Sequence, residues 1–177
     1  MDKNSASEER FTGLILLTGV DSPGISAALF SALEPFSITI LDVEQIVTRS
    51  RFVLTVLIEA DPAHSKSIEE DLNLCAEKLG VDIAVSFSFE STASLLQKTE
   101  MIQIKASMQK LTPGAIAKLA SEIVAAGGNI ERVHRSASTP LTTLDFFISG
   151  VQTNSIRGLT DESATIFGLE IAIVENS

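Results

Sequence analysis

Apolar residues recur along the chain in two patterns. Some segments alternate apolar and polar residues, which is typical of half-buried strands, and others repeat apolar residues every three or four positions, which is typical of helices. In the first half these patterns predict strands over 11–18, 38–48, 52–59 and 81–89, and helices over 25–34 and 68–79. The predicted order is therefore strand, helix, strand, strand, helix, strand.

The second half of the chain repeats this order. Its patterns predict strands over 101–108, 129–138, 141–149 and 169–174, and helices over 116–124 and 155–167, of which the second has the weaker apolar pattern. Arg49-Ser50-Arg51 and Thr139-Pro140 are the predicted hairpin turns. Two copies of one small domain are thus expected to fill the chain.

A fixed spacing between matching residues supports the duplication. At an offset of 90, the pairs are Leu14 and Ile104, Pro23 and Pro113, Gly24 and Gly114, Ile40 and Ile130, Val43 and Val133, Leu54 and Leu144, and Ile58 and Ile148. Further on, at an offset of 88, Val81, Ile83 and Val85 match Leu169, Ile171 and Ile173. Such self-similarity predicts tandem repeats of one structural unit.

The predicted fold class is α+β, with two ferredoxin-like βαββαβ domains. Each is expected to form a four-stranded antiparallel sheet with two helices on one face, because strand-helix-strand crossovers are right-handed. The predicted boundaries are a disordered leader over 1–10, a first domain over 11–90, a linker over 91–99 and a second domain over 100–177.

Composition excludes several classes of protein. Hydrophobic residues make up 45% of the chain in short, interrupted runs, so no membrane span is expected. The polar N-terminus lacks the apolar core of a signal peptide, which favours the cytoplasm.

Cys75 is the only cysteine, so an intrachain disulfide and a multi-cysteine metal site are excluded. It lies on the apolar face of its helix and is expected to be a core residue.

A net charge of −10 and the lack of Trp and Tyr argue against a nucleic-acid partner, which needs a basic stripe and stacking faces. His64 and His134 have no convergent partners, so neither a metal nor a cofactor is expected. Arg132, His134 and Arg135 have two interpretations. They form either a solvated strand face, which is favoured, or a small basic patch for a phosphate or a docked domain.

A turn lies between the first strand and the first helix of each half. Its residues are Asp21-Ser22-Pro23-Gly24 in the first copy and Lys110-Leu111-Thr112-Pro113-Gly114 in the second. Ser or Thr before Pro is a common helix start, which needs no ligand. Glycine at the second helical position, however, leaves backbone amides open to a carboxylate, and Asp21 offers a partner for an ammonium group. The second interpretation is a site for a free amino acid.

Three segments of the first half resemble a known family. The span Thr18 to Gly24, the later Leu41-Asp42-Val43-Glu44-Gln45 and the strand Arg51 to Leu57 are similar to the first ACT domain of actinobacterial-type phosphoserine phosphatases. The second half resembles the second ACT domain of these enzymes, so that the resemblance covers residues 11–175. It implies a cytoplasmic regulatory module of L-serine biosynthesis that binds serine or a related amino acid between ACT units, forms a homodimer and signals to a phosphatase domain in cis or in trans.

The resemblance also implies which residues bind the ligand. The matching residues are Asp21, Ser22, Pro23 and Gly24 in the first loop, and Pro113 and Gly114 in the second. Asp42 and Gln45 are added because this strand of an ACT domain faces the loop of a neighbouring unit, and Asn129 is added as an amide donor. Leu111 and Thr112 replace Asp21 and Ser22 in the second copy. That loop therefore either binds with help from another unit or is mainly structural.

Catalysis by these residues is not expected. The nucleophile motif of the phosphatase domain, Asp-x-Asp-x-Thr/Val, does not occur in the sequence. The chain is therefore expected to be the regulatory part of the enzyme, as a fragment or a free-standing regulator. One alternative is a two-ACT regulator similar to the glycine-cleavage regulatory protein, which acts through a protein partner. Another is a scaffold in which the sheets only dimerise.

Overall fold

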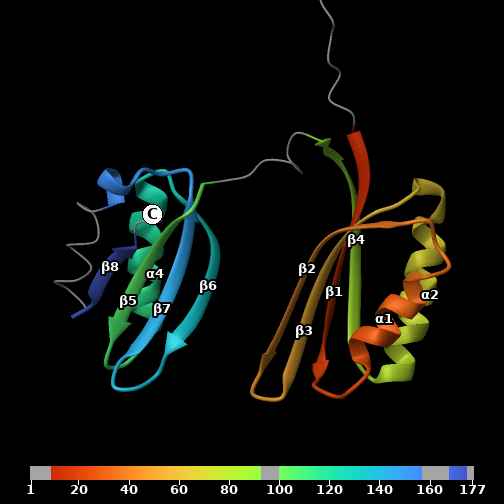
Figure 1. Ribbon diagram of the computed structural model, residues 1–177, viewed down its shortest axis with the longest axis horizontal. Coiled ribbons are helices and arrows are strands. Elements are labelled where there is room, and N and C mark those ends of the chain that lie inside the picture. The colour runs from red at the N-terminus through yellow and green to blue at the C-terminus, as the bar shows by residue number, and fades with distance from the viewer. Residues whose placement is uncertain (1–8, 93–99, 157–167, 175–177) are drawn as a thin grey trace, which may run out of the picture. The chain divides into compact units, whose positions relative to one another are not determined.

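The computed structural model describes residues 9–92, 100–156 and 168–174. The chain divides into two compact units, residues 1–97 and 98–177 (Figure 1). Each unit has its own sheet and its own hydrophobic core.

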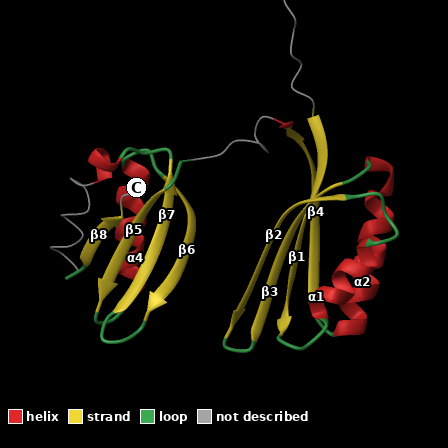
Figure 2. Ribbon diagram, viewed as in Figure 1, coloured by secondary structure: helices red, strands yellow, loops and turns green. Residues whose placement is uncertain are grey.

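The first unit is a four-stranded sheet covered on one face by two helices (Figure 2). Its elements are β1 Glu9–Val20, α1 Ile25–Leu33, β2 Thr39–Thr48, β3 Arg51–Glu59, the short 3-10 helix η1 Pro62–His64, α2 Ser65–Leu79 and β4 Asp82–Ser91. The strand order is β2-β3-β1-β4, and all neighbours are antiparallel. Leu29 of α1 and Leu72 of α2 pack into one core with Ile15 and Leu54 of the sheet. Cys75 is buried, as predicted, and burial raises the pKa of its thiol.

The second unit has the same strand order. Its elements are β5 Ile102–Met108, α4 Pro113–Ala125, β6 Asn129–Ala137, β7 Thr142–Ser149 and β8 Glu170–Val174, with the order β6-β7-β5-β8. Leu119 and Ile123 of α4 pack against Ile104 and Phe146 of the sheet. Most of the predicted helix over 155–167 lies outside the described residues. The predicted fold class, two ferredoxin-like α+β units, is confirmed.

The first strand begins earlier than predicted. Glu9 and Arg10 belong to β1, where they pair with Ser91 and Glu90 of β4. The Arg10 guanidinium also donates to Glu59 across the sheet at 3.0 Å. The boundary of the predicted leader at residue 10 and the start of the linker at residue 91 were therefore wrong, because β1 and β4 extend each other at this end.

A β-bulge at the same position marks the edge strand of both units. The register of β2 shifts between Ile40 and Asp42, and that of β6 shifts between Ile130 and Arg132. Ile40 faces Ile58 just as Ile130 faces Ile148, which confirms the offset of 90 for these strands. A shared irregularity of this kind supports duplication of one unit more strongly than shared apolar residues do.

The first strands match at an offset of 89 instead. Ile15 pairs with Val56, and the equivalent pair in the second unit is Ile104 with Phe146. The predicted match of Leu14 to Ile104 was wrong, because Leu14 is 50% exposed whereas Ile104 is fully buried. A slip of one residue moves a strand side chain to the other face of its sheet. The second unit therefore has one more residue between Ile104 and Pro113 than the first unit has between Ile15 and Pro23.

Candidate functional site

The loop between β1 and α1 is held against the hairpin that joins β2 and β3. The Asp21 amide donates to the Ser50 carbonyl at 2.9 Å. Arg49 and Ser50 have positive φ angles of 46° and 64°. Two such residues form the tight hairpin turn whose twist matches that of paired strands. Gly24 has a φ of 95° and is the last residue before the helix. Glycine at the second helical position was therefore wrong for this copy, because the helix begins one residue later.

Helix α1 starts without a side-chain cap. Gly24 occupies the cap position, and no side chain there bonds the first amides of the helix. The Gly24 carbonyl accepts the first helical hydrogen bond from the Ala28 amide. The first-turn amides of a helix have no partner within the helix, and they carry the positive end of its dipole. Such a helix start can hold a carboxylate group.

A hollow of about 360 Å³ opens at this helix start. Its lining consists of Asp21, Ser22, Pro23, Gly24, Ile25, Ser26, Ala27, Gln45 and Phe52. The Ser26 hydroxyl donates to the Gln45 amide oxygen at 2.8 Å. Because that oxygen accepts from Ser26, the amide nitrogen of Gln45 is the atom that can donate to a bound molecule. An acid, a hydrogen-bonded polar pair and open amides thus surround one small space.

The structure brings together five of the predicted site residues, namely Asp21, Ser22, Pro23, Gly24 and Gln45. It places Asp42 elsewhere. Asp42 lies opposite Leu57 on the sheet face away from the helices, where its carboxylate accepts from the Val43 amide at 2.9 Å. Sequence reasoning missed Ser26 and Phe52. Ser26 is a polar residue within the otherwise apolar first turn of α1. That position in the sequence is the signal that could have identified it as a site residue.

The loop of the second unit is built differently. Thr112 is the cap of α4, and its hydroxyl accepts from the Ala115 amide at 3.4 Å. Pro113 and Gly114 are the first two residues of the helix, as predicted for this copy. The neighbouring hollow of about 440 Å³ is lined by Ser107 to Lys110, Leu141, Gly168 and Glu170, on the strand side of the turn. In this copy the Thr112 side chain thus bonds one of the amides at the helix start.

Replacing Thr112 with alanine is expected to destabilise the protein by about 1 kcal/mol, because a side-chain cap is lost. The matched change Ser22→Ala should cost no more than a few tenths of a kcal/mol, since Ser22 does not cap α1. Urea denaturation followed by circular dichroism measures both variants. Equal losses would show that the two loops are capped alike.

Asn129 lies at the far end of its sheet from the loop of the same unit. It pairs with Ser149 at the start of β6, and its amide donates to Glu131 at 2.8 Å. Hydrogen bonds from Ser149 and Asn129 lower the pKa of the Glu131 carboxyl. Pro113 and Gly114 follow Met108, at the other end of β5. A role for Asn129 in ligand binding remains a prediction that needs the loop of another unit.

The three residues of the alternative basic patch, Arg132, His134 and Arg135, are divided between the two faces of β6. Arg135 lies opposite the core residue Leu144, whereas His134 lies opposite Asp145 on the other face. Asp145 is nearly fully buried and accepts from Ser136 at 2.9 Å and from Lys105 at 3.1 Å. Burial alone raises the pKa of this carboxyl, but the bonds from Ser136 and Lys105 outweigh burial and hold the pKa below its usual value. This face of the second sheet is therefore a polar network.

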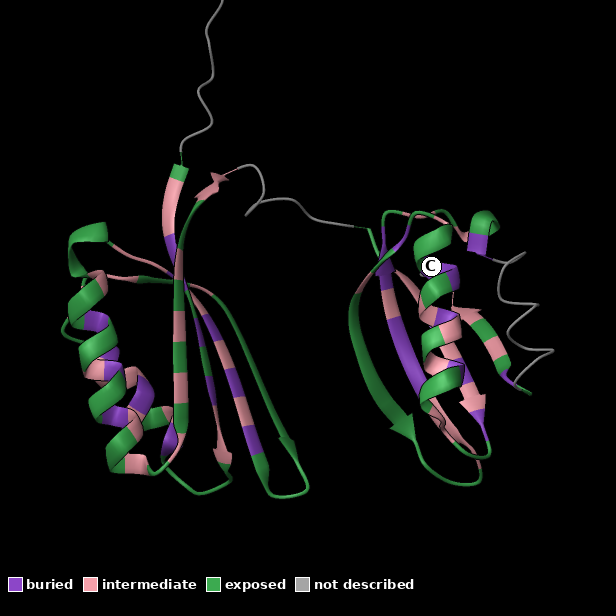
Figure 3. Ribbon diagram, turned by 180° about the vertical axis from the view of Figure 1, so that it is seen from behind, coloured by how far each residue is buried: buried purple, intermediate pink, exposed green. Residues whose placement is uncertain are grey.

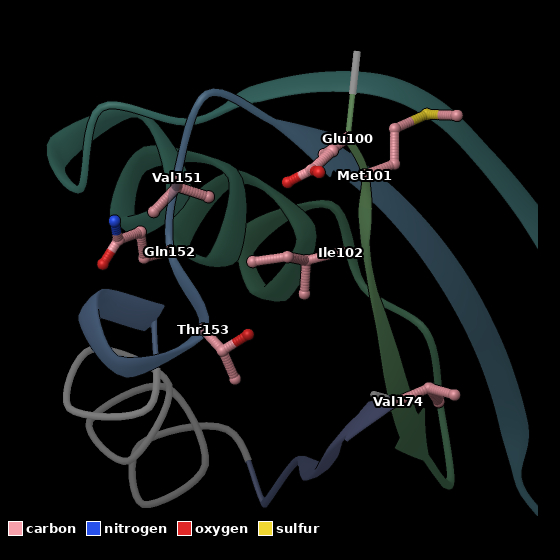
Figure 4. A pocket seen from close by; sticks show the side chains of 7 residues that line it. All are labelled: Glu100, Met101, Ile102, Val151, Gln152, Thr153 and Val174. Atoms are coloured by element: carbon pink, nitrogen blue, oxygen red, sulfur yellow. The ribbon is translucent and has the colours of Figure 1, made fainter. Parts of the chain in front are cut away.

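Another hollow, of about 540 Å³, lies at the opposite end of the second sheet from the α4 loop. Figure 4 shows Ile102, Val151 and Thr153 pointing into one space, which is also lined by Glu100, Met101, Gln152 and Val174. None of the predicted site residues lines it.

The described part of the chain contains neither a grouping of metal ligands nor a helix that could span a membrane. No group of three or more His, Cys, Asp or Glu side chains within residues 9–92, 100–156 and 168–174 is arranged to hold a metal ion. Over the same ranges, every helix is too short or too polar to cross a membrane.

Residues 12–86 match the family model of the ACT domain. A phosphoserine phosphatase of Streptomyces coelicolor is 32% identical over 92% of this chain, and a phosphoserine phosphatase of Mycobacterium tuberculosis is 30% identical over 77%. The chain spans 40% and 33% of the length of these relatives. A solved structure provisionally assigned as a glycine cleavage system transcriptional repressor has a TM-score of 0.76 at 13% identity, covering 94% of this chain and 98% of that one. At this identity the likeness concerns the fold.

Proposed function

Because the chain belongs to the ACT domain family, we propose that it is an amino-acid-binding regulatory module of a phosphoserine phosphatase, acting in serine biosynthesis in the cytoplasm. The first loop is its ligand site, and L-serine is the proposed ligand. The relatives named as phosphoserine phosphatases support the choice of partner, which acts in cis or in trans. Catalysis belongs to the partner domain.

The uncapped start of α1, facing Asp21 and Gln45 across one hollow, is the observation that carries this proposal. A free amino acid has a carboxylate, which the open amides of the helix start attract. Its ammonium group suits the Asp21 carboxylate, through a charge-assisted hydrogen bond. Ligand sites span roughly 300–1,000 Å³, so a hollow of this size favours a small amino acid.

The two loops then have different roles. Thr112 already bonds one amide of α4, and Leu111 takes the place of the carboxylate. We therefore assign the second loop, with Pro113 and Gly114, a mainly structural role. Binding at the first loop regulates through linkage, since a ligand at a hundred times its dissociation constant stabilises the binding state by about 2.7 kcal/mol. A shift of that size is sufficient to change how a homodimer or a phosphatase domain is engaged.

Isothermal titration calorimetry with the twenty amino acids tests the proposal. L-serine is expected to bind with a stoichiometry of one per chain and to raise the melting temperature, whereas D-serine, which presents its side chain differently, should bind less tightly. A chain that binds none of the twenty amino acids would contradict the proposed function.

A second candidate function is a regulator that acts through a protein partner other than a phosphatase. The fold match along 94% of this chain to the provisionally assigned repressor is the observation behind it. The two functions differ in a measurement of phosphoserine hydrolysis. Serine should change the rate of a phosphatase carrying or contacting this module under the first function, and should leave that rate unchanged under the second.

A further inference from the structure

The two helices of the first unit lie side by side on one face of its sheet and leave a groove between them (Figure 1). The groove contains a hollow of about 450 Å³. Its lining is mostly small or apolar and includes Ala28, Ser31 and Ala32 of α1 and Leu74, Cys75 and Leu79 of α2. We call this space the helix groove. Leu74 is 52% exposed, so a large apolar side chain at the groove is open to contact from outside.

Helix α4 shows that the fold does not require small residues at these positions. At an offset of 90, the buried residues of the two helices match, namely Ile25 with Ala115, Leu29 with Leu119, and Leu33 with Ile123. The same offset matches Ala28 to Lys118 and Ala32 to Glu122. Lys118 and Glu122 form an ion pair at 3.3 Å, in which Glu122 is buried. The first unit therefore has a hollow where the second unit has two long side chains.

The charge around the helix groove indicates the chemistry of its partner. Residues 24–36 and 61–80, which form the helices and their ends, have six acidic side chains and two basic ones, namely Glu34, Asp61, Glu69, Glu70, Asp71 and Glu77 against Lys66 and Lys78. Asp71 lines the groove, as does Pro35, which follows Glu34. Lys78 lines it two turns further along α2. This surface is negative overall, so a positively charged partner complements it.

We propose that the helix groove binds a basic amphipathic helix of a partner protein. In this mode of recognition, apolar residues three or four positions apart enter a groove, and the polar residues beside them meet its edges. Small side chains on α1 let a third helix approach closely, and Leu74 packs against its apolar stripe. Lysine or arginine side chains of the partner meet Asp71. This inference does not rest on the proposed ligand site, because the two hollows share no lining residue.

The length of the helix groove sets the expected affinity. Asp71 and Lys78 are about 10 Å apart along the axis of α2, so the partner contributes about two to three turns of helix. A contact of that length is small for a protein interface, and a dissociation constant of about 10–100 μM is expected. Salt screens attraction between exposed charges, so raising NaCl from 50 to 500 mM should weaken binding severalfold.

Fluorescence anisotropy with a labelled synthetic peptide tests the inference on the full chain. The probe is a peptide of leucine and lysine, about 14 residues long, in which the leucines recur every three or four positions and form one face of a helix. It should bind with the affinity given above. A peptide with glutamate in place of lysine, and a peptide of the same composition without the leucine stripe, should each bind at least tenfold more weakly.

Two variants locate the binding site in the helix groove. Ala28→Lys/Ala32→Glu introduces the ion pair of the second unit, so it fills the groove without changing the net charge. It should weaken binding of the leucine and lysine peptide at least tenfold, and circular dichroism checks that the variant is folded. Asp71→Asn keeps the shape of the groove but removes a negative charge from its lining. It should weaken binding by about three- to tenfold.

The matched control for Asp71→Asn is Glu69→Gln. Glu69 is an exposed acid of the same helix, and two positions of an α-helix place it on the opposite side from Asp71. The control should bind the peptide within twofold of the wild type. The inference is overturned by a wild-type chain that does not bind the peptide at 500 μM, by wild-type affinity in Ala28→Lys/Ala32→Glu, or by equal losses in Asp71→Asn and Glu69→Gln.

Sedimentation equilibrium distinguishes the proposed partner helix from a second copy of this chain. Because the helix groove is assigned to another protein, Ala28→Lys/Ala32→Glu should have the same mass in solution as the wild type at every concentration. A lower mass for this variant would show that a second copy occupies the groove, and would overturn the inference.

Discussion

Replacing Asp21 with asparagine is expected to weaken serine binding by about 10–100-fold. The carboxylate of Asp21 is the acidic group of the first loop that lines the hollow, and a hydrogen bond to a charged group is worth about 1.5–3 kcal/mol. Asparagine keeps the size of the side chain, and the bond to Ser50 is made by the backbone amide, so the loop should keep its shape. Isothermal titration calorimetry measures the change.

Asp82→Asn is the matched control for this prediction. Asp82 is an exposed aspartate of the same unit that lies opposite Thr18 on the other face of the sheet, so the variant removes one negative charge at a distance from the loop. It should bind serine within about twofold of the wild type. Equal affinity for serine in all three proteins would show that Asp21 does not hold the ammonium group.

Replacing Phe146 with alanine is expected to lower the free energy of unfolding of the second unit by about 3–5 kcal/mol. Phe146 is 1% exposed, and it packs with Ile104, Leu119 and Ile123 at the centre of that core. Removing a buried aromatic ring loses its transfer free energy and leaves a cavity. Because the chain lacks Trp and Tyr, hydrogen exchange with mass spectrometry is a better measurement than fluorescence. Amides of β5 and β7 should exchange about 100–5,000-fold faster.

Phe147→Ala controls for the loss of an aromatic ring. Phe147 is the next residue of β7, but it is only half-buried, and it stacks on the His134 ring at 5.8 Å on the polar face. This variant should cost roughly 1–2 kcal/mol. Amides of β1 and β3 should exchange at the wild-type rate in both variants, because Phe146 belongs to the core of the second unit alone. Faster exchange throughout the chain would mean that the two units unfold together.

The order of strands and helices could be predicted because apolar spacing and turn residues agree in both halves. Ile25, Leu29 and Leu33 recur every four residues and are all buried under the first sheet. Gly80 ends α2 with a φ of 66°, in the left-handed region where glycine is favoured. These signals are local, so a single sequence contains them.

The face of each residue in β1 could not be predicted from the sequence. Leu14, Ile15, Leu16 and Leu17 are all apolar, and alternation identifies the buried face only when the other face is polar. The apolar pattern therefore matches Leu14 to Ile104, although Ile15 is the structural equivalent of Ile104. The exposed apolar residues of β1, Leu14 and Leu16, are thus the reason that the pattern does not identify the buried face.

The site could be predicted only in part, because its geometry depends on contacts between distant residues. Asp21 to Gly24 were found from their sequence motif, whereas Ser26 joins them through its bond to Gln45, nineteen positions away. The left-handed conformation of Gly24 and the missing cap of α1 could not be read from Ser22-Pro23-Gly24. The same order of residues, Thr112-Pro113-Gly114, forms a capped start in the second unit.

The bulges in β2 and β6 have a consequence for solubility. Both strands lie at an edge of their sheet and are exposed along most of their length (Figure 3), and the outer side of an edge strand is a template for adding further strands. A bulge kinks and twists an edge strand, and a kinked edge fits a straight incoming strand poorly. In each unit the bulge therefore opposes open-ended polymerisation through the sheet edge.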